Sequence, residues 1–349
     1  MKRILILILI PALLASLNIA AQETGSDPGK NENLTVVFYN TENLFDIKDD
    51  PFTRDEDFTP DSDKKWDHKK YIKKTEDLSK VLSSISEPNL PGIIGLAEVE
   101  NKKVLIDLVN TKNLRSGNYE IVHHDGPDKR GIDVAMLYRK DLFKVEFHRS
   151  IPISFPRDSS LSRDILMVRG KTNDSENLYV FVNHWKSRSG GVSVTEFKRI
   201  YSAVILRKIV DSIFNFEPKA KIIIMGDFND EPTNRSIHQV LQANNKRKNP
   251  DKRDLYNLMY DMHNLNDLGS YHYSGSWNML DQIIISQSLL DKKHGYFTNY
   301  EGGEIFNKEW MLYHNSKAGA WTPNKTYGGD TYFGGISDHL PVYVVLKTK

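Results

Sequence analysis

Several short polar motifs in this chain carry side chains that can bind metal ions, move protons or contact phosphate. Each motif follows or borders an apolar run that is typical of a buried strand. The residues of interest are Asn40, Glu98, His184, Asp227, Asn229, Asp281, Asp338 and His339. Carboxylate and amide oxygens ligate hard divalent cations, while imidazole and carboxylate groups serve as general acids and bases. Because the strand ends of an open sheet line one edge, we expect these side chains to meet.

The segment IIIMGDFNDEP shows the arrangement most clearly. Its apolar part, 222–225, reads as a buried strand, which is a rigid mount for a preorganised site. Asp227 and Asn229 follow at once, where they can be presented to water and phosphate. The next two carboxylates, Asp230 and Glu231, are expected to serve the following turn instead.

Each of these residues alone has a simpler interpretation. Asn40 could be a turn or cap residue, Glu98 could begin a helix, and Asp227 with Asn229 could form an Asx turn. Residues that served only as separate turns or caps would not, however, be expected to include every type of side chain that a metal-dependent phosphoesterase uses. In such an enzyme, a divalent ion held by carboxylate and amide oxygens neutralises the phosphodiester and stabilises the leaving oxygen. The combination therefore favours phosphoester hydrolysis.

The elements that must position these residues alternate between strands and helices along the chain. Apolar runs predict strands over 34–39, 92–96, 119–122, 133–138, 166–168, 178–182, 222–225, 282–286 and 340–346. Helical spacing predicts helices over 66–85, 104–109 and 194–214, the last with Phe197, Tyr201, Val204, Ile205 and Ile209 on one side. This interleaving predicts an α/β (α+β) chain with sheets in the core.

The amino terminus has the layout of a secretory signal peptide. Lys2 and Arg3 precede an apolar run, 4–17, and small residues end the segment at Ala21. We expect a signal peptide over 1–21, a disordered polar leader over 22–33 and a catalytic domain over 34–349. The protein would then be exported, periplasmic or secreted, with no integral membrane segment in its mature form. An uncleaved N-terminal anchor is the alternative.

Composition excludes several classes of function. The chain has no cysteine, so disulfides, a thiolate nucleophile, thiolate metal sites and a lipoprotein anchor on cysteine are excluded. Without Lys2 and Arg3 it keeps 45 basic against 46 acidic residues, a net charge of −1. Because no global basic field attracts nucleic acid, any binding of anions must be local.

The assembled motifs resemble those of the endonuclease/exonuclease/phosphatase superfamily, which includes deoxyribonuclease I, exonuclease III, inositol polyphosphate 5-phosphatases and neutral sphingomyelinases. The matching pieces, in the family's order, are YNTENLF from Tyr39, LAE from Leu96, RGIDVAMLY from Arg130, NHW from Asn183, GDFN from Gly226, LDQI from Leu280 and SDHLP from Ser337. They cover about residues 34–347. The resemblance, which is to deoxyribonuclease I / exonuclease III-like members, implies a four-layer sandwich: two packed mixed β-sheets flanked by helices. Together with the signal-peptide pattern it indicates an exported bacterial member.

The resemblance also implies a role for each matching residue. Glu98 would be the main metal ligand, supported by Asn40 and Asp338, with Mg²⁺ as the expected ion and Mn²⁺ or Ca²⁺ as alternatives. The catalytic residues would be His184, Asp227, Asn229, Asp281 and His339. His339, paired with Asp281, would act as a base or as an electrostatic stabiliser. Arg163 is similar to a phosphate-contacting arginine, and Asp125 is the candidate carboxylate that orients His184.

The substrate is less closely indicated than the chemistry. Lys186 and Arg188 follow His184 and could track a phosphate backbone, or they could be exposed loop charges. The aromatic residues before Asp281, namely Tyr271, Tyr273 and Trp277, could stack on bases or pack their own loop. The stretch WNMLDQ lacks the Cys and Arg of the inositol phosphatase motif, which disfavours that substrate.

We therefore expect a nuclease that hydrolyses DNA or RNA with the help of a metal ion, an aspartate and a histidine. The first alternative is a phosphatase or phosphodiesterase for small-molecule, inositol or lipid headgroup phosphates. The second is a non-catalytic binding module that has the same fold. The catalytic positions all carry competent side chains, which disfavours this last alternative.

Overall fold

The computed structural model describes residues 32–348 except 157, 159, 267, 317 and 318. The predicted signal peptide, 1–21, and residues 22–31 of the predicted leader lie outside the described residues. The described residues form one compact unit. No helix within the described part of the chain is long and apolar enough to cross a membrane.

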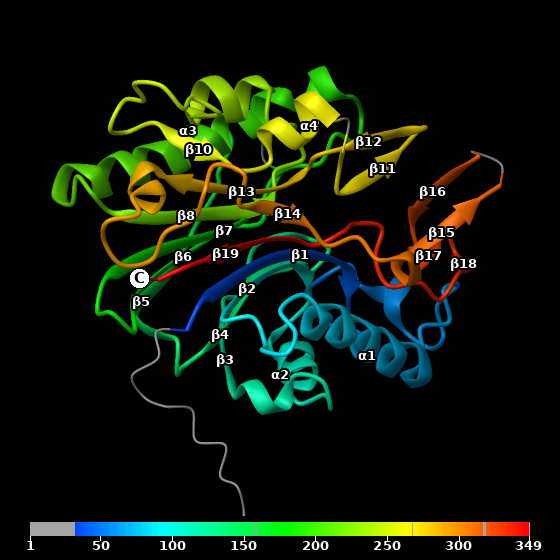
Figure 1. The fold of residues 1–349 in the computed structure, drawn as a ribbon. Helices are drawn as coiled ribbons and strands as arrows, with labels where there is room; N and C mark the ends of the chain where they lie inside the picture. Colours follow the sequence, from blue (N-terminus) through cyan, green and yellow to red (C-terminus); the bar gives the residue numbers. More distant parts are fainter. Residues whose placement is uncertain (1–31, 157, 159, 267, 317–318, 349) are drawn as a thin grey trace, which may run out of the picture. The chain divides into compact units, whose positions relative to one another are not determined.

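Two large mixed sheets form the centre of this unit (Figure 1). The first sheet has six strands, and β1 and β2 are its parallel pair. In spatial order its strands are β14 (Gly303–Ile305), β19 (Val342–Leu346), β1 (Leu34–Leu44), β2 (Ile93–Val99), β4 (Asp133–Arg139) and β3 (Tyr119–His123). The sheet thus places the first strand of the domain beside the last one.

The second sheet has seven strands, with β7 and β8 as a central parallel pair. Its order is β5 (Phe143–Ile151), β6 (Ile165–Thr172), β7 (Asn177–His184), β8 (Lys221–Asp227), β13 (Asp281–Ser286), β10 (Leu255–Asn257) and β9 (Ala243–Asn244). The predicted hairpin of β6 and β7 is confirmed. The sequence patterns missed β5, because most of this edge strand is exposed and lacks an apolar run.

Helices cover the outer face of each sheet. The first sheet packs against α1 (His68–Ser84) and α2 (Lys102–Val109), and the second packs against α3 (Val192–Phe216). Figure 1 shows α1 and α2 on one side of the paired sheets and α3 on the other. A third apolar cluster, with Phe38 from β1 and Val180 from β7, fills the space between the sheets. The four-layer α/β sandwich is therefore confirmed.

Smaller elements surround the ends of the sheets. The described segment between β10 and β19 contains α4 (Tyr260–Asn266) and three hairpins: β11 (Tyr271–Tyr273) with β12 (Ser276–Asn278), β15 (Leu312–Asn315) with β16 (Ala320–Pro323), and β17 (Tyr327–Gly328) with β18 (Thr331–Tyr332). Short helical turns lie at Glu56–Phe58, Arg115–Gly117, Ser236–Val240, Gln287–Leu290 and Glu309–Met311.

The first strand extends beyond the expected end at residue 39. Strand β1 continues to Leu44, and its parallel register with β2 shifts between Asn40 and Leu44. Within this irregular part, Glu42 and Asn43 have φ angles of 50° and 61°. Such left-handed conformations interrupt a regular ladder, so the polar part of the strand bends locally although it remains paired.

The face of α3 that packs on the sheet differs from the expected one. Phe197, the first residue of the predicted face, is 47 % exposed, whereas Arg199 and Arg207 are buried. The spacing of apolar residues did not predict this face, because the face includes the charged but buried Arg199. Nε of Arg199 lies 2.7 Å from Oδ1 of Asp230. The other carboxylate oxygen of Asp230 accepts a hydrogen bond from Ser236. A buried charge is tolerated when it is paired in this way. Asp230 thus serves the packing that follows β8, as expected.

Candidate active site

The register of three neighbouring strands brings predicted catalytic residues side by side. In the seven-stranded sheet, His184 of β7 pairs with Asp227 of β8, and Asp227 pairs in turn with Asp281 of β13. These three residues occupy one row at the end of the sheet, and all are buried. The register of the parallel pair β7–β8 and of the antiparallel pair β8–β13 is therefore sufficient to place these three residues next to one another.

The six-stranded sheet supplies the facing groups. Asn40 pairs with Ala97 in the parallel ladder of β1 and β2, and Glu98 follows in a left-handed conformation with φ of 60°. That backbone conformation is uncommon for a residue with a Cβ and marks a locally imposed constraint. The loop before β19 joins them, because the Ser337 hydroxyl donates to the Asn40 carbonyl oxygen at 2.8 Å. Asp338 and His339 are carried by this loop.

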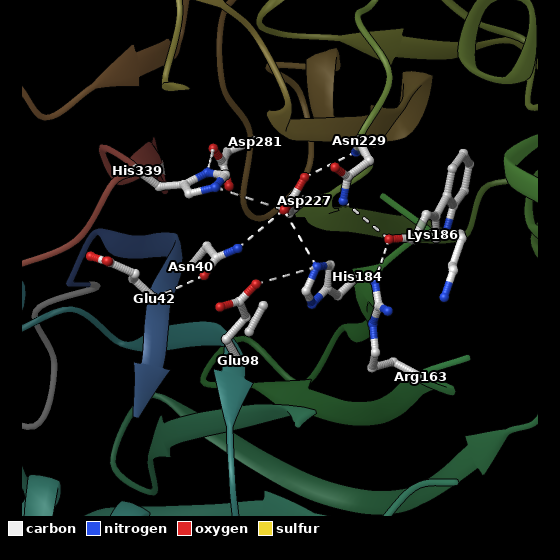
Figure 2. Close-up of polar contacts among 12 residues, drawn as sticks. Asn40, Glu42, Glu98, Arg163, His184, Lys186, Asp227, Asn229, Asp281 and His339 are labelled. Carbon is white, nitrogen blue, oxygen red and sulfur yellow. Dashed lines mark hydrogen bonds and ion pairs between the residues drawn. The ribbon is translucent and has the colours of Figure 1, made fainter. Parts of the chain in front are cut away.

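One carboxylate oxygen, Oδ2 of Asp227, is the meeting point of the site (Figure 2). The Asn40 amide donates to it at 3.1 Å, while Nε2 of His184 and Nε2 of His339 lie 3.5 and 4.0 Å away. The other oxygen of Asp227 accepts a hydrogen bond from the backbone N–H of Asn229 at 2.9 Å. Asn229 itself has φ of 50°, which folds the chain back after the strand.

His339 is held by a buried carboxylate. Its Nδ1 lies 2.6 Å from Oδ2 of Asp281, and that oxygen also accepts a hydrogen bond from Ser270. Burial opposes protonation of the imidazole, but Asp281, then Asp338 and Asp227, together raise the pKa of His339 well above its ordinary value. The predicted pairing of His339 with Asp281 is confirmed, and these carboxylates favour the protonated imidazole.

His184 has the opposite electrostatic character. Burial, followed by the positive charges of Arg163 and Arg130, holds the pKa of His184 well below its ordinary value. The imidazole is therefore neutral at pH 7. Its Nε2 lies 3.5 Å from Asp227 and 3.8 Å from Oε1 of Glu98.

The carboxylate proposed for His184 from the sequence, Asp125, lies elsewhere. Its Oδ1 is 3.7 Å from Nδ1 of His123, and its side chain is 91 % exposed. Asp125 belongs to the loop after β3, which ends at His123, and the loop directs this carboxylate back toward its own strand. The assignment of Asp125 to His184 is therefore corrected: Glu98 and Asp227 are the carboxylates beside that histidine.

The site gathers more negative charge than its buried position favours. Burial raises the pKa of Asp227 to about 6, and Asp281 and Glu98 add to the rise while His339 opposes it. Loss of solvation also raises the pKa of Asp338, with Glu98 contributing and His339 and Lys74 opposing. Such an excess of carboxylate is the environment in which a divalent cation binds favourably.

The donor set fits a hard divalent ion. Glu98 and Asp338 are partly exposed carboxylates, and Oε2 of Glu98 is oriented by the backbone N–H of Asn43 at 3.1 Å. Asn40 donates to Asp227 through its amide nitrogen, and its amide oxygen accepts from the backbone N–H of Glu42. Oxygen ligands of this kind suit Mg²⁺, Mn²⁺ or Ca²⁺. Asn40 and Glu98 thus lie beside Asp227 and His184, while Asp338 lies beside His339, and the assignment of these three residues to one ion stays a prediction.

The three predicted phosphate-binding cations have different surroundings. Arg163 is buried: its guanidinium lies 3.0 Å from Asp128 and also donates to the carbonyl oxygen of Trp185. Arg188 donates to the Asn229 carbonyl oxygen at 2.8 Å and thereby supports the turn that presents this residue. Their contacts indicate bracing rather than direct phosphate binding. Lys186 is partly exposed, as Arg188 is, and a phosphate can approach it.

A buried lysine that the sequence patterns overlooked lies beneath the site. Lys74 of α1 donates to the carbonyl oxygen of Ile336 at 2.5 Å and to the hydroxyl of Thr326 at 2.7 Å. The backbone N–H of Thr326 donates in turn to Glu42, whose pKa is raised to about 7, first by burial and then by Asp338. Lys74 thus anchors the segment that leads into Asp338 and His339.

A signal for Lys74 does exist in the sequence. It lies three residues after Tyr71 and four before Leu78, on the buried stripe of α1. A lysine in that position requires buried partners, although spacing alone does not identify them.

The comparisons with known proteins agree with this geometry. Residues 35–348 match the profile of the Endonuclease/Exonuclease/phosphatase family. The fold is similar to TDP2 of D. rerio complexed with a single-strand DNA product, with 13 % identity and a TM-score of 0.55 over 91 % of this chain and 100 % of that one. No match was found among curated proteins.

Two further solved structures share the fold. A family protein of Bacteroides thetaiotaomicron is 16 % identical, with a TM-score of 0.55 over 91 % of this chain and 98 % of that one. The human Nocturnin catalytic domain with a bound sulfate anion is also 16 % identical, with a TM-score of 0.52 over 91 % and 95 % of the two chains. At these identities the likeness concerns the fold.

Replacing Asp281 by Asn is expected to lower the pKa of His339 in the metal-free protein, because the carboxylate at 2.6 Å no longer stabilises the imidazolium. A folded-state pKa above the unfolded value stabilises the protein at low pH, and this contribution is lost as pH rises through the folded pKa. In Asp281→Asn, this contribution to folding stability should therefore be lost at a lower pH than in wild type. NMR titration of the imidazole measures the shift. Asp291→Asn, beside the exposed His294, is the control, and an unchanged His339 pKa in Asp281→Asn would contradict the assignment.

Replacing Lys74 by Met should destabilise the fold by about 2 kcal/mol, because the buried Ile336 carbonyl and Thr326 hydroxyl lose their donor. Chemical denaturation measures the free energy of unfolding. Lys69→Met, at an exposed position of the same helix, is expected to leave the stability nearly unchanged. Equal effects of the two variants would show that Lys74 is not an anchor.

Proposed function

This chain belongs to the endonuclease/exonuclease/phosphatase family, whose members are metal-dependent phosphoric ester hydrolases, and from that premise we propose that it hydrolyses phosphodiester bonds of DNA or RNA. The observation that carries the hydrolytic part is the environment of Asp227 Oδ2, which a neutral His184 and a charged His339 approach from two sides. Hydrogen-bond donors that are already in place stabilise the negative charge that develops on phosphoryl oxygens in the transition state.

The proposed division of labour follows from the charges. A bound divalent ion, held by Glu98, Asp338 and Asn40, would neutralise the phosphate and stabilise the leaving oxygen. Asp227, with a pKa near 6 before any ion is bound, is suited to orient a water molecule and accept its proton.

The two histidines and Asn229 complete the proposed scheme. The His339 imidazolium, oriented by Asp281, donates to a phosphoryl oxygen and stabilises negative charge there. Because its pKa is raised, we favour the role of electrostatic stabiliser over that of base. His184 binds another phosphoryl oxygen as a neutral donor, and Asn229 helps to place the water.

The nucleic-acid part of the proposal is supported by a row of aromatic rings beside the site. The ring of Tyr271 lies 4.7 Å from that of His339, at 30° to it. Tyr273 continues the row, parallel to Tyr271 within 9°, and is 68 % exposed. A base next to the scissile phosphate could stack on this exposed face, since stacking accepts every base. Lys186, on the far side of His184, would contact the phosphate backbone of the nucleic acid.

A specific observation favours one alternative substrate class. An apolar groove of about 520 Å³ lies beside the same hairpin and is lined by residues that include Met262, Leu268, Trp277, Ile305, Leu312 and Trp321. A phosphodiester that carries an apolar group, such as a lipid headgroup, would use such a groove. Lipid headgroup phosphates are part of the first alternative function, which also includes small-molecule phosphates and inositol phosphates.

Export is part of the proposal, with a periplasmic or secreted location. Its support is the signal-peptide pattern of Lys2, Arg3 and the apolar run 4–17. Sequencing of the mature amino terminus tests it, because a chain that still begins at Met1 after expression in its own cells would contradict cleavage.

The hydrolytic proposal predicts that Mg²⁺-dependent cleavage of bis(p-nitrophenyl) phosphate and of plasmid DNA falls by at least about 1000-fold in Asp227→Ala and His339→Ala. Each variant removes a group that contacts the reacting phosphate in the proposed scheme. Asp291→Ala and His314→Ala, at exposed positions outside the site, should retain wild-type rates. A wild-type protein that is inert with Mg²⁺ and Mn²⁺ on every phosphoester would instead favour the non-catalytic binding module.

The same mature protein distinguishes the substrate classes. Initial rates are compared on single- and double-stranded DNA, RNA, inositol phosphates and sphingomyelin at one ionic strength. The proposal expects the highest kcat/KM on nucleic acid and a raised KM there in Tyr273→Ala. A preference for sphingomyelin or for a small phosphate would establish the alternative.

A further inference from the structure

A second group of potential metal ligands lies at the base of the loop between β3 and β4. Among the described residues, one ligand atom each from His123, Asp125 and Asp133 can be chosen so that all three lie within 4.8 Å of one another. His123 ends β3, Asp133 begins β4, and Asp125 lies two residues after the histidine. The three residues therefore enclose both ends of the loop 124–132.

The histidine of this group is buried without a complete set of partners. Its side chain is 2 % exposed, and no hydrogen bond reaches its Nε2 within the described ranges of the chain. Oδ2 of Asp133 lies 3.4 Å from Nε2, and Oδ1 of Asp125 lies 3.7 Å from Nδ1. Both distances are longer than the 2.6 Å contact of His339 with Asp281.

One imidazole and two carboxylates form a ligand set for a borderline divalent ion. Zn²⁺ binds histidine nitrogen and aspartate oxygen at about 2.0–2.2 Å, so ligand atoms within 4.8 Å of one another can share one ion after small side-chain movements. Mg²⁺ is disfavoured because imidazole does not suit it. Asp125 is 91 % exposed, which leaves an entry path and room for water ligands.

We propose that His123, Asp125 and Asp133 form a second divalent-metal site, of the Zn²⁺ class, that closes the loop between β3 and β4. The site is separate from the ligands assigned to the catalytic ion, namely Asn40, Glu98 and Asp338. It does not depend on which phosphodiester the protein hydrolyses.

The loop that this ion would close leads toward the catalytic centre. Asp128, in the middle of the loop, is buried and pairs with Arg163 at 3.0 Å. The guanidinium of Arg163 donates to the carbonyl oxygen of Trp185, the residue after His184. Binding of an ion at both ends of the loop reduces the conformations available to Asp128, and so supports the contacts behind His184.

The test is Zn²⁺ binding to the full mature chain, measured by calorimetry and by metal content after dialysis. Wild type is expected to bind two ions per chain. The double variant Glu98→Gln/Asp338→Asn should retain one ion, and its Tm should still rise by about 5 °C with saturating Zn²⁺. Addition of Asp125→Asn to that variant should remove this ion and the rise in Tm.

Asp125→Asn alone is the decisive single variant, because the exposed carboxylate can be replaced without disturbing the core. It should leave the metal-free Tm unchanged and weaken the second Zn²⁺ by at least about 100-fold, since loss of even an indirect partner costs 10–100-fold. His123→Ala should have the same effect on binding.

Asp291→Asn is the matched control, because Asp291 and His294 form an exposed pair 3.4 Å apart that is not part of a three-residue ligand group among the described residues. It should retain both ions. Full binding of two Zn²⁺ by Asp125→Asn, or loss of all Zn²⁺ in Glu98→Gln/Asp338→Asn, would overturn the proposal. These readouts are independent of hydrolysis.

Discussion

The common register of β7, β8 and β13 is the constraint on which the catalytic centre depends. It places His184, Asp227 and Asp281 in one row, and Oδ2 of Asp227 then faces both His184 and His339. A shift by one residue in any of these strands would turn its functional side chain to the opposite face of the sheet. The apolar residues of 222–225 pack on both faces of β8, so the strand that carries Asp227 is buried between two apolar clusters.

The row is useful only because the six-stranded sheet faces it. Glu98 and Asn40 come from β2 and β1, and the loop before β19 adds Asp338 and His339. The left-handed conformations of Glu98 and Asn229 show that the backbone at this edge is constrained by its surroundings. Glu98 lies within β2, and Asn229 lies two residues after the end of β8, so the packed strands hold both residues in place.

Charge balance explains why basic residues are distributed around the acidic centre. Lys74 lies beneath Glu42 and Asp338, and the pKa of Lys74 is lowered by burial but supported by these carboxylates. Arg163 and Arg188 stabilise the opposite side through Asp128 and the Asn229 carbonyl. The fold is shared with proteins only 13–16 % identical to this chain, so the identity of the substrate must depend on the groups around this centre rather than on the sandwich itself.

The sequence by itself determined the family and the four-layer α/β fold, because strand periodicity and short motifs are local properties. It also predicted a set of catalytic side chains. It also indicated that His339 and Asp281 belong together, although 58 residues separate them.

Tertiary structure alone decided which charged residues are buried. Lys74 and Arg199 are charged, yet both are fully buried against partners distant in the sequence. It likewise placed Asp125 beside His123 and not beside His184. Arg163 and Arg188 contact groups of the protein, namely Asp128 and the Asn229 carbonyl oxygen. The physical reason is that the same carboxylate or guanidinium is stable in water or in a buried ion pair, and only the packing of remote segments determines which environment it has.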